Sequence, residues 1–284
     1  MDDTAEPGGA PEPAPGGAHG DFAAEMSYGD YLALDRLLAC QTPRSDSHDE
    51  MLFIVIHQSA ELWMKLAIHE LSAARDLIAA DRLGPCFKML ARVARIQSQL
   101  IHSWDVLTTL TPADYMTFRE QLGKSSGFQS YSYRTIELLL GSKNPALLAP
   151  HRHRPDLHDP LHALLHRRSL YDEVVHLLAR RGFAIAPEHL GRDVAGPYTP
   201  HPSVKAAWLE VYRHTDRHWD LYELAEKLVD LEDWLQLWRY RHVRTVQRVI
   251  GFKRGTGGTA GVAYLKRLVD QPFFHELWDI RTEV

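Results

Sequence analysis

The sequence has little cysteine and no marked excess of either charge. Its 284 residues include two cysteines, Cys40 and Cys86, without the spacing of a CxxC motif. This excludes a disulfide framework and favours a reducing, cytoplasmic compartment. The 32 basic and 37 acidic residues leave a net charge of -5. That balance gives no electrostatic reason to expect a nucleic-acid or membrane partner.

Long apolar runs are also missing, and so is a secretory signal. No uninterrupted apolar run approaches the roughly 20 residues that cross a bilayer. The N-terminus lacks a charged segment followed by an apolar one. Residues 1–25 contain six Ala, five Gly and four Pro, which is too little apolar surface to offset the entropy of ordering. We therefore expect a disordered tail over 1–25 and a single folded domain over 26–284.

Helical patterns fill most of the remaining chain, whereas long alternating β-branched runs are rare. Periodic apolar positions and runs of good helix formers predict helices over 49–80, 86–109, 112–122, 133–140, 169–182, 202–250 and 262–270. Thr111, Pro112 and Asp114 have the order of an N-cap, a first-turn proline and a capping-box partner. Residues 141–168 are rich in Pro and His and should be irregular, with one short helix. The pattern predicts an all-α fold, a helical bundle with long connections.

The helical segment 223–250 has a histidine in its apolar seam. Alternating steps of three and four give the seam residues Leu228, Leu231, Leu235, Trp238, His242, Thr245 and Val249. His242 should therefore face the bundle interior. It could be a neutral core histidine with hydrogen-bond partners, or a ligand of a metal or of haem iron. The arginines near it could bind haem propionates or could face solvent. The helix alone leaves both interpretations open.

A second histidine, His57, shares a predicted helix face with Glu61 and Lys65 at four-residue steps. The three could form a surface charge ladder. The apolar block 52–56 before His57 and Trp63 after it favour a partly buried face instead. A histidine and a glutamate four residues apart could also bind a metal. Di-metal sites in bundles repeat Glu-x-x-His on two helices, and no second copy occurs at a matching position, so such a centre is not expected.

Two further segments are candidates for ligand binding. Arg119 and Tyr115 lie four residues apart on one predicted helix, where the arginine could hold a carboxylate or make a cation–π contact. The glycine-rich segment 255–261 lacks the spacing of a phosphate-binding P-loop and follows no strand. A flexible lid with Thr256 as a hydrogen-bonding group fits it better; the alternative is a plain interhelical loop.

Three long motifs in order connect these candidates. They are HDEMLFIVIHQSAELWMK (48–65), FREQLGKSSGFQSYSYR (118–134) and WRYRHVRTVQRVIGFKRGTGGTAGVAYL (238–265). With them, the chain resembles the tryptophan 2,3-dioxygenase family of haem enzymes over nearly all of 26–284. The resemblance implies a helical bundle that encloses a haem b pocket. It also implies insertion of O2 into the indole ring of L-tryptophan to give N-formylkynurenine, the first step of the kynurenine pathway.

On the haem side, the resemblance assigns three residues. His242 matches the proximal ligand of the haem iron, in agreement with its place in the apolar seam. Trp104 and Ser126 match positions near the haem. No motif of the family maps onto residues 141–200, and no function is assigned there.

On the substrate side, five residues match positions of the family. His57 corresponds to the distal histidine near the indole nitrogen and is the candidate catalytic residue. Phe53 and Tyr115 correspond to aromatic residues that line the substrate site. Arg119 corresponds to the partner of the substrate carboxylate, and Thr256 to the residue that binds the ammonium and carboxylate groups.

The resemblance also implies a homotetramer. Tyr28, Tyr31 and Leu32 match a helical segment that reaches into the active site of a neighbouring subunit. Two other functions remain open at this point. A haem-binding sensor or carrier would bind tryptophan or dioxygen without converting it, and an inert helical scaffold with a core His242 would be colourless.

Overall fold

The computed structural model describes residues 15–19 and 22–284. The chain divides into two compact units, Met1–Thr42 and Pro43–Val284. Much of the predicted tail, residues 1–14, 20 and 21, lies outside the described residues. Residues 26–42, which the sequence analysis grouped with the main domain, belong to the first unit in this division.

The first unit has one 3-10 turn and two short helices, η1 (Pro15–Gly17), α1 (Tyr28–Leu32) and α2 (Leu34–Leu37). Ser27 and Asp30 form a capping box that starts α1. Ala33 then adopts a left-handed conformation with φ 51°, which ends α1 and separates it from α2. These helices carry apolar side chains on their accessible surface.

The second unit is helical throughout its regular elements. In chain order these are α3 (His48–Ala79), α4 (Leu83–Leu107), α5 (Pro112–Phe118), η2 (Arg119–Leu122), η3 (Gly127–Gln129), α6 (Tyr131–Leu140), η4 (Pro145–His151), α7 (Pro155–Leu165), α8 (Leu170–Arg180), α9 (Pro187–Leu190), α10 (Pro202–Arg213), α11 (Trp219–Ile250), α12 (Val262–Val269), α13 (His275–Asp279) and η5 (Ile280–Thr282). No strand occurs among the described residues. The predicted all-α class is confirmed.

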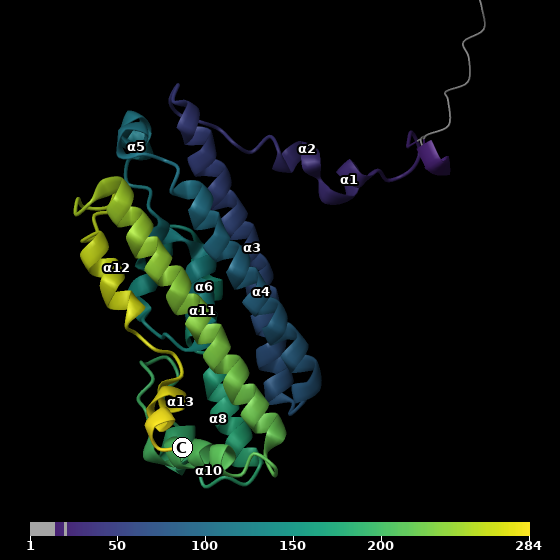
Figure 1. Ribbon diagram of the computed structural model, residues 1–284, viewed down its shortest axis with the longest axis vertical. Coiled ribbons are helices and arrows are strands. Elements are labelled where there is room, and N and C mark those ends of the chain that lie inside the picture. The colour runs from purple at the N-terminus through teal and green to yellow at the C-terminus, as the bar shows by residue number, and fades with distance from the viewer. Residues whose placement is uncertain (1–14, 20–21) are drawn as a thin grey trace, which may run out of the picture. The chain divides into compact units, whose positions relative to one another are not determined.

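Three long helices form the body of this unit. α3 packs against α4, α6 and α8, while α11 packs against α4 and α12. In Figure 1, α5 lies at one end of α3, α4 and α11, and α10 and α13 lie at the opposite end. The predicted inner face of α4 is buried as expected: Leu90, Val93, Gln97, Leu100, Trp104 and Leu107.

The α5 end of the bundle has an aromatic core cluster of its own. Its buried members are Trp104, Leu107, Leu110, Tyr115 and Phe118. Partly buried residues from α3 and α11 pack against it, including Phe53 and Trp238. The cluster is separate from the large core that the rest of α3, α4 and α11 share with α8 and α10. It brings together three of the segments that the sequence analysis marked for chemistry.

The structure corrects the prediction of one continuous helix over 202–250. α10 ends at Arg213, and α11 begins at Trp219. His214 has φ -129° and ψ 54°, outside the helical region, although its amide still donates to the carbonyl of Glu210. The break coincides with the polar run 213–218 between Tyr212 and Trp219, a signal that the sequence analysis did not use.

The region 141–168 is more regular than expected. It contains η4 and the eleven-residue helix α7. Pro155 is the first residue of α7, and Asp156 is an acidic residue in its first turn, both of which favour a helix start. The short helix α13 was not predicted, because its five residues are too few to show a period.

The helix α3 has one unusual property for a helix of this bundle. By length and composition it could cross a membrane, with a mean hydropathy of 1.3 over its most apolar 18-residue window, of which 11% is buried. Polar residues interrupt this stretch, so the sequence contains no uninterrupted apolar run of that length. Core helices of bundles can be equally long and apolar. The C-terminal half of α3 packs in the main core. The helix is the source of several exposed apolar side chains: Met51, Val55, Leu62, Trp63 and Leu66.

Candidate functional site

His57 projects from α3 at the α5 end of the bundle. Its Nδ1 lies 2.7 Å from the carbonyl oxygen of Phe53. A carbonyl only accepts hydrogen bonds, so Nδ1 carries the proton and Nε2 keeps its lone pair. The side chain has accessible surface, yet surrounding protein desolvates it and lowers its pKa, against the opposing effects of the Phe53 carbonyl and Glu61. His57 is therefore a neutral histidine with Nε2 ready to accept a hydrogen bond.

His242 lies on α11 and is held by aromatic rings. The indole of Trp104 stacks on its imidazole, with ring centroids 4.9 Å apart and planes 10° from parallel. Trp238 packs beside both rings. Burial, with a smaller contribution from His57, lowers the pKa of His242 to about 4. The two predicted histidines are thus close enough to interact electrostatically, and both are neutral near pH 7.

Phe53 and Tyr115 form an aromatic wall next to His57. The Phe53 ring lies 4.1 Å from the His57 ring and 5.9 Å from that of Tyr115, centroid to centroid. Phe118, which the sequence analysis did not single out, completes the wall at 5.5 Å from Phe53 and is fully buried. In the sequence, its position about one helical turn after Tyr115 could have indicated that both rings line the same wall. The wall offers a flat apolar surface beside a hydrogen-bond acceptor.

Arg119 begins η2, directly after this wall. Its Nη2 donates to the carbonyl oxygen of Arg254 at 3.0 Å, while its buried Nε has no hydrogen-bond partner. Burial raises the pKa of Tyr115, and the charge and hydrogen bond of Arg119 oppose that rise. The guanidinium is thus held in place with its Nε–H unpaired, on the edge that it shares with an Nη group. A bidentate carboxylate is the ligand that such an edge fits.

The glycine-rich segment lies against the loop before η3. The Thr256 hydroxyl donates to the carbonyl oxygen of Ser125. A Cβ atom added at Gly257 would stand 2.7 Å from the Cβ of Ser126, so only glycine permits this approach. Gly261 has φ 58°, and a Cβ there would lie 2.6 Å from the Lys253 carbonyl oxygen. The segment is therefore a closely fitted loop rather than a loose connection.

The site residues on α3, η2, α11 and the glycine-rich segment lie in the three motifs of the sequence, whereas Tyr115 and Trp104 lie outside them. The sequence matches the family model described as tryptophan 2,3-dioxygenase over residues 15–211 and 209–284. The chain belongs to the tryptophan 2,3-dioxygenase family.

Individual relatives that carry this name are similar over nearly the whole chain. A tryptophan 2,3-dioxygenase of Bacillus cereus is 58% identical over 268 residues, which cover 94% of this chain and 96% of the relative. One of Ralstonia pickettii is 59% identical over 264 residues, 93% of this chain and 95% of the relative. One of Burkholderia cenocepacia is 58% identical over 262 residues, 92% and 84% respectively.

Enzymes of the tryptophan 2,3-dioxygenase family use haem, and the residues near His242 fit such a group. A neutral imidazole is the form of histidine that binds iron. The indole Nε1 of Trp104, stacked on that imidazole, is buried without a hydrogen-bond partner, which a bound group next to it would supply. Ser126, the other residue expected near the haem, caps η3 with its side chain and remains half-buried.

Two of the arginines around His242, Arg239 and Arg241, are committed elsewhere. Arg239 is buried and donates to Tyr133 and Glu137 on α6. It also donates to the carbonyl oxygen of Leu268 in α12 and to that of Gln271 just after this helix. Arg241 pairs with Asp105. Neither is available for haem propionates without breaking these contacts. Arg239 instead ties the helix of His242 to α6 and α12, a role that the sequence pattern did not indicate.

Glu61 has a definite partner as well. Its Oε1 accepts a hydrogen bond of 2.6 Å from the hydroxyl of Ser130, the N-cap residue of α6. The interpretation of His57, Glu61 and Lys65 as a surface charge ladder is therefore incomplete. Through this hydrogen bond, Glu61 connects α3 to the loop that carries Ser126.

The remaining predicted residues, Tyr28, Tyr31 and Leu32, lie in the first unit. Tyr28 and Tyr31 are 76% and 77% exposed, and Leu32 is 40% exposed. Because the two units are not placed relative to one another, the structure does not bring these three residues to the site. Their assignment stays a prediction.

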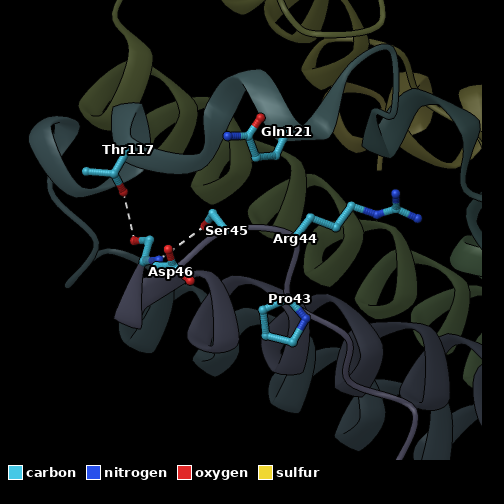
Figure 2. Close-up of a pocket in the computed structure, with 7 residues that line it drawn as sticks. Pro43, Arg44, Ser45, Asp46, Thr117 and Gln121 are labelled. Atoms are coloured by element: carbon cyan, nitrogen blue, oxygen red, sulfur yellow. Dashed lines mark hydrogen bonds between the residues drawn. The ribbon is translucent and has the colours of Figure 1, made fainter.

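A polar pocket of about 750 Å³ lies near the site without including it. Figure 2 shows it between the loop before α3 and the α5–η2 segment, with Arg44 and Gln121 on opposite walls. The Thr117 hydroxyl donates to that of Ser47 at 2.7 Å and closes one end. None of the predicted site residues lines this pocket.

Proposed function

We propose that this chain is a haem-dependent dioxygenase in which His242 holds the iron and His57 faces the indole of L-tryptophan. Membership of the family gives the reaction, in which both atoms of O2 add to the indole ring and N-formylkynurenine is formed. The observation that carries the assignment of residues is the stacking of Trp104 on the His242 imidazole, with ring centroids 4.9 Å apart and the indole Nε1 buried without a hydrogen-bond partner.

The haem side of the site rests on His242 and Trp104. Haem bound there supplies the iron at which dioxygen reacts. His242 would hold the iron through a ring nitrogen, and the stacked indole of Trp104 fixes the orientation of that ring. Ser126 supports the neighbouring loop through its cap on η3.

The substrate side orients tryptophan at both ends. The free Nε of Arg119 and one of its Nη groups pair with the substrate carboxylate, with Thr256 nearby for the ammonium group. At the other end, Nε2 of His57 accepts a hydrogen bond from the indole N–H. Phe53 and Tyr115 pack on the ring and exclude water. Fixing both ends brings the reacting double bond to one place, which is the contribution of the protein to the rate.

A homotetramer completes the proposal. Exposed apolar side chains occur in the first unit, at Tyr28 and Tyr31, and along the N-terminal half of α3. Surfaces of this kind mark contacts with other protein chains. In the assembly the first unit reaches the active site of a neighbour, so that residues 26–284 act as one functional domain. The chain has two cysteines without the spacing of a CxxC motif, in keeping with a cytoplasmic enzyme.

The experiment follows the oxygen atoms. Reduced, haem-loaded protein is mixed with L-tryptophan under ¹⁸O2, and the product is analysed by mass spectrometry. We expect N-formylkynurenine with two ¹⁸O atoms. Tryptophan binding without product would show a haem-binding sensor or carrier instead, and product with one labelled oxygen would show a monooxygenase.

A further inference from the structure

Three histidines share one face of α7, in the region that the family motifs leave unassigned. His158, His162 and His166 follow at four-residue steps, and His166 is the C-cap residue of the helix with φ and ψ still in the right-handed helical region. The adjacent face is anchored, because Leu161 and Leu165 are buried. The histidine face is therefore carried on a fixed helix, with its rings at the surface.

The distance between two of these rings matches a shared metal ion. The ring centroids of His162 and His166 are 4.4 Å apart. Metal–nitrogen bonds of about 2.1 Å put the centroids of two imidazoles about 4.6 Å apart at a right angle and about 5.3 Å apart at a tetrahedral angle. The observed spacing fits neighbouring positions of a tetragonal or octahedral metal. The rings of His158 and His162, 6.0 Å apart, do not fit either case.

The hydrogen bond of His166 prepares it for this role. Its Nδ1 lies 2.9 Å from the carbonyl oxygen of His162, so Nδ1 carries the proton and Nε2 has the lone pair. Histidines that bind metals usually donate the other ring N–H to a carbonyl or carboxylate in this way. Both side chains are exposed, so a hydrated ion has direct access.

We propose that His162 and His166 form a two-histidine site for a divalent transition metal that favours square or octahedral geometry, Cu²⁺ above all. No group of three or more His, Cys, Asp or Glu ligands occurs in the part of the chain that the structure describes. Two imidazole nitrogens therefore bind the ion, and water or a small chelator fills its other positions. Cu²⁺ binds nitrogen ligands more tightly than the other common divalent metals of its row.

The other close histidine pair of the second unit does not compete. His189 and His201 lie 5.0 Å apart and stack. One nitrogen of His189 contacts the Tyr198 hydroxyl, and His201 accepts hydrogen bonds from Ser203 through Nδ1. Metal binding there would have to break a half-buried network, whereas the α7 pair needs no such change.

The test uses the full-length, haem-loaded protein and Cu²⁺ as its iminodiacetate complex, which leaves neighbouring coordination positions open and binds poorly to single histidines. Titration calorimetry at pH 7.5 compares the parent with His162→Gln, His166→Gln and the control His158→Gln. We expect the parent and the control to bind one equivalent at the α7 site. Each of the other two variants should lose that equivalent or bind it at least tenfold more weakly.

Two results would overturn the proposal. One is a parent protein that binds no more complex than His166→Gln. The other is equal weakening by His158→Gln and His166→Gln, which would show adventitious binding to a histidine-rich surface. All three side chains have accessible surface and Gln is a good helix former, so circular dichroism should confirm unchanged folding. The haem absorption spectrum should be the same in all four proteins, which separates this site from the dioxygenase assignment.

Discussion

At the scale of single residues, the chemistry depends on which nitrogen atoms remain available. The Phe53 carbonyl accepts a hydrogen bond from Nδ1 of His57, which leaves Nε2 as an acceptor. The Arg254 carbonyl accepts a hydrogen bond from Nη2 of Arg119, whose Nε stays unpaired. Sequence spacing predicted that His242 faces inward, and its aromatic stacking agrees with that. It could not predict these backbone contacts, because they join segments more than a hundred residues apart or depend on side-chain rotamers.

The role of His57 as a hydrogen-bond acceptor gives a limited expected loss. The indole N–H is a very weak acid, so we expect His57→Ala to lower kcat/KM about tenfold, the value of one buried hydrogen bond. Steady-state kinetics with haem content measured in parallel provide the check. A loss of several thousandfold with haem intact would show that His57 acts as an essential base.

The pH dependence of the reaction should also reveal the protonation of His57. Burial favours the neutral imidazole and lowers the pKa of His57. Its acceptor form therefore persists as the pH falls through the ordinary histidine value of about 6.5. We expect kcat/KM for tryptophan to decline only below that pH, and the decline to disappear in His57→Gln. An acid limb at or above 6.5 that depends on His57 would contradict the structure.

Arg119 should discriminate substrates by their carboxylate. Arg119→Ala removes a charge-assisted, two-bond contact, so kcat/KM for tryptophan should fall about a hundredfold. Tryptamine has no carboxylate, and its turnover should change less than about threefold. Parallel assays with both substrates decide the point, and equal damage to both would rule out the proposed contact.

At the scale of elements, the long helices were predictable and the joints between them were not. The periodicity of α4 and α11 placed their inner faces correctly, and Thr111 with Asp114 marked the start of α5. The break between α10 and α11 falls in the polar run 213–218, which contains neither Gly nor Pro, so the common helix-ending residues were missing and only the backbone of His214 shows where the helix ends. The close fit of the glycine-rich segment likewise depends on a contact with a distant loop.

That fit makes Gly257 a sensitive position. Gly257→Ala puts a methyl group 2.7 Å from the Cβ of Ser126, and the resulting displacement of Thr256 should raise KM for tryptophan about tenfold, from an overpacking cost of about 1–3 kcal/mol. Haem content should not change. In a Ser126→Gly background the clash partner is gone, and the same substitution should have a smaller effect. An unchanged penalty in that background would mean that the contact does not position the loop.

At the scale of the whole molecule, the chain consists of a large helical unit and a small first unit with exposed tyrosines. The sequence predicted the helical body well. It assigned the first unit to a neighbour's active site only through the family resemblance, because no local pattern records which subunit a segment reaches.

Subunit complementation tests that exchange. A double variant Tyr28→Ala/Tyr31→Ala and the variant Arg119→Ala should each have low activity alone. Refolded or co-expressed together, they should regain activity, since the intact first unit of one chain can serve the intact site of the other. Activity no greater than that of the separate variants would show that the first unit serves its own chain.

The most direct measurement is the visible absorption spectrum of the haem-supplemented protein, reduced under CO, compared with that of His242→Ala. An intense Soret band of a histidine-ligated haem in the parent, lost or altered in the variant, is the result we predict. Absence of a band in both proteins, or the same band in both, would contradict the assignment of His242 as the iron ligand, and absence in both would remove the haem on which the proposed reaction depends.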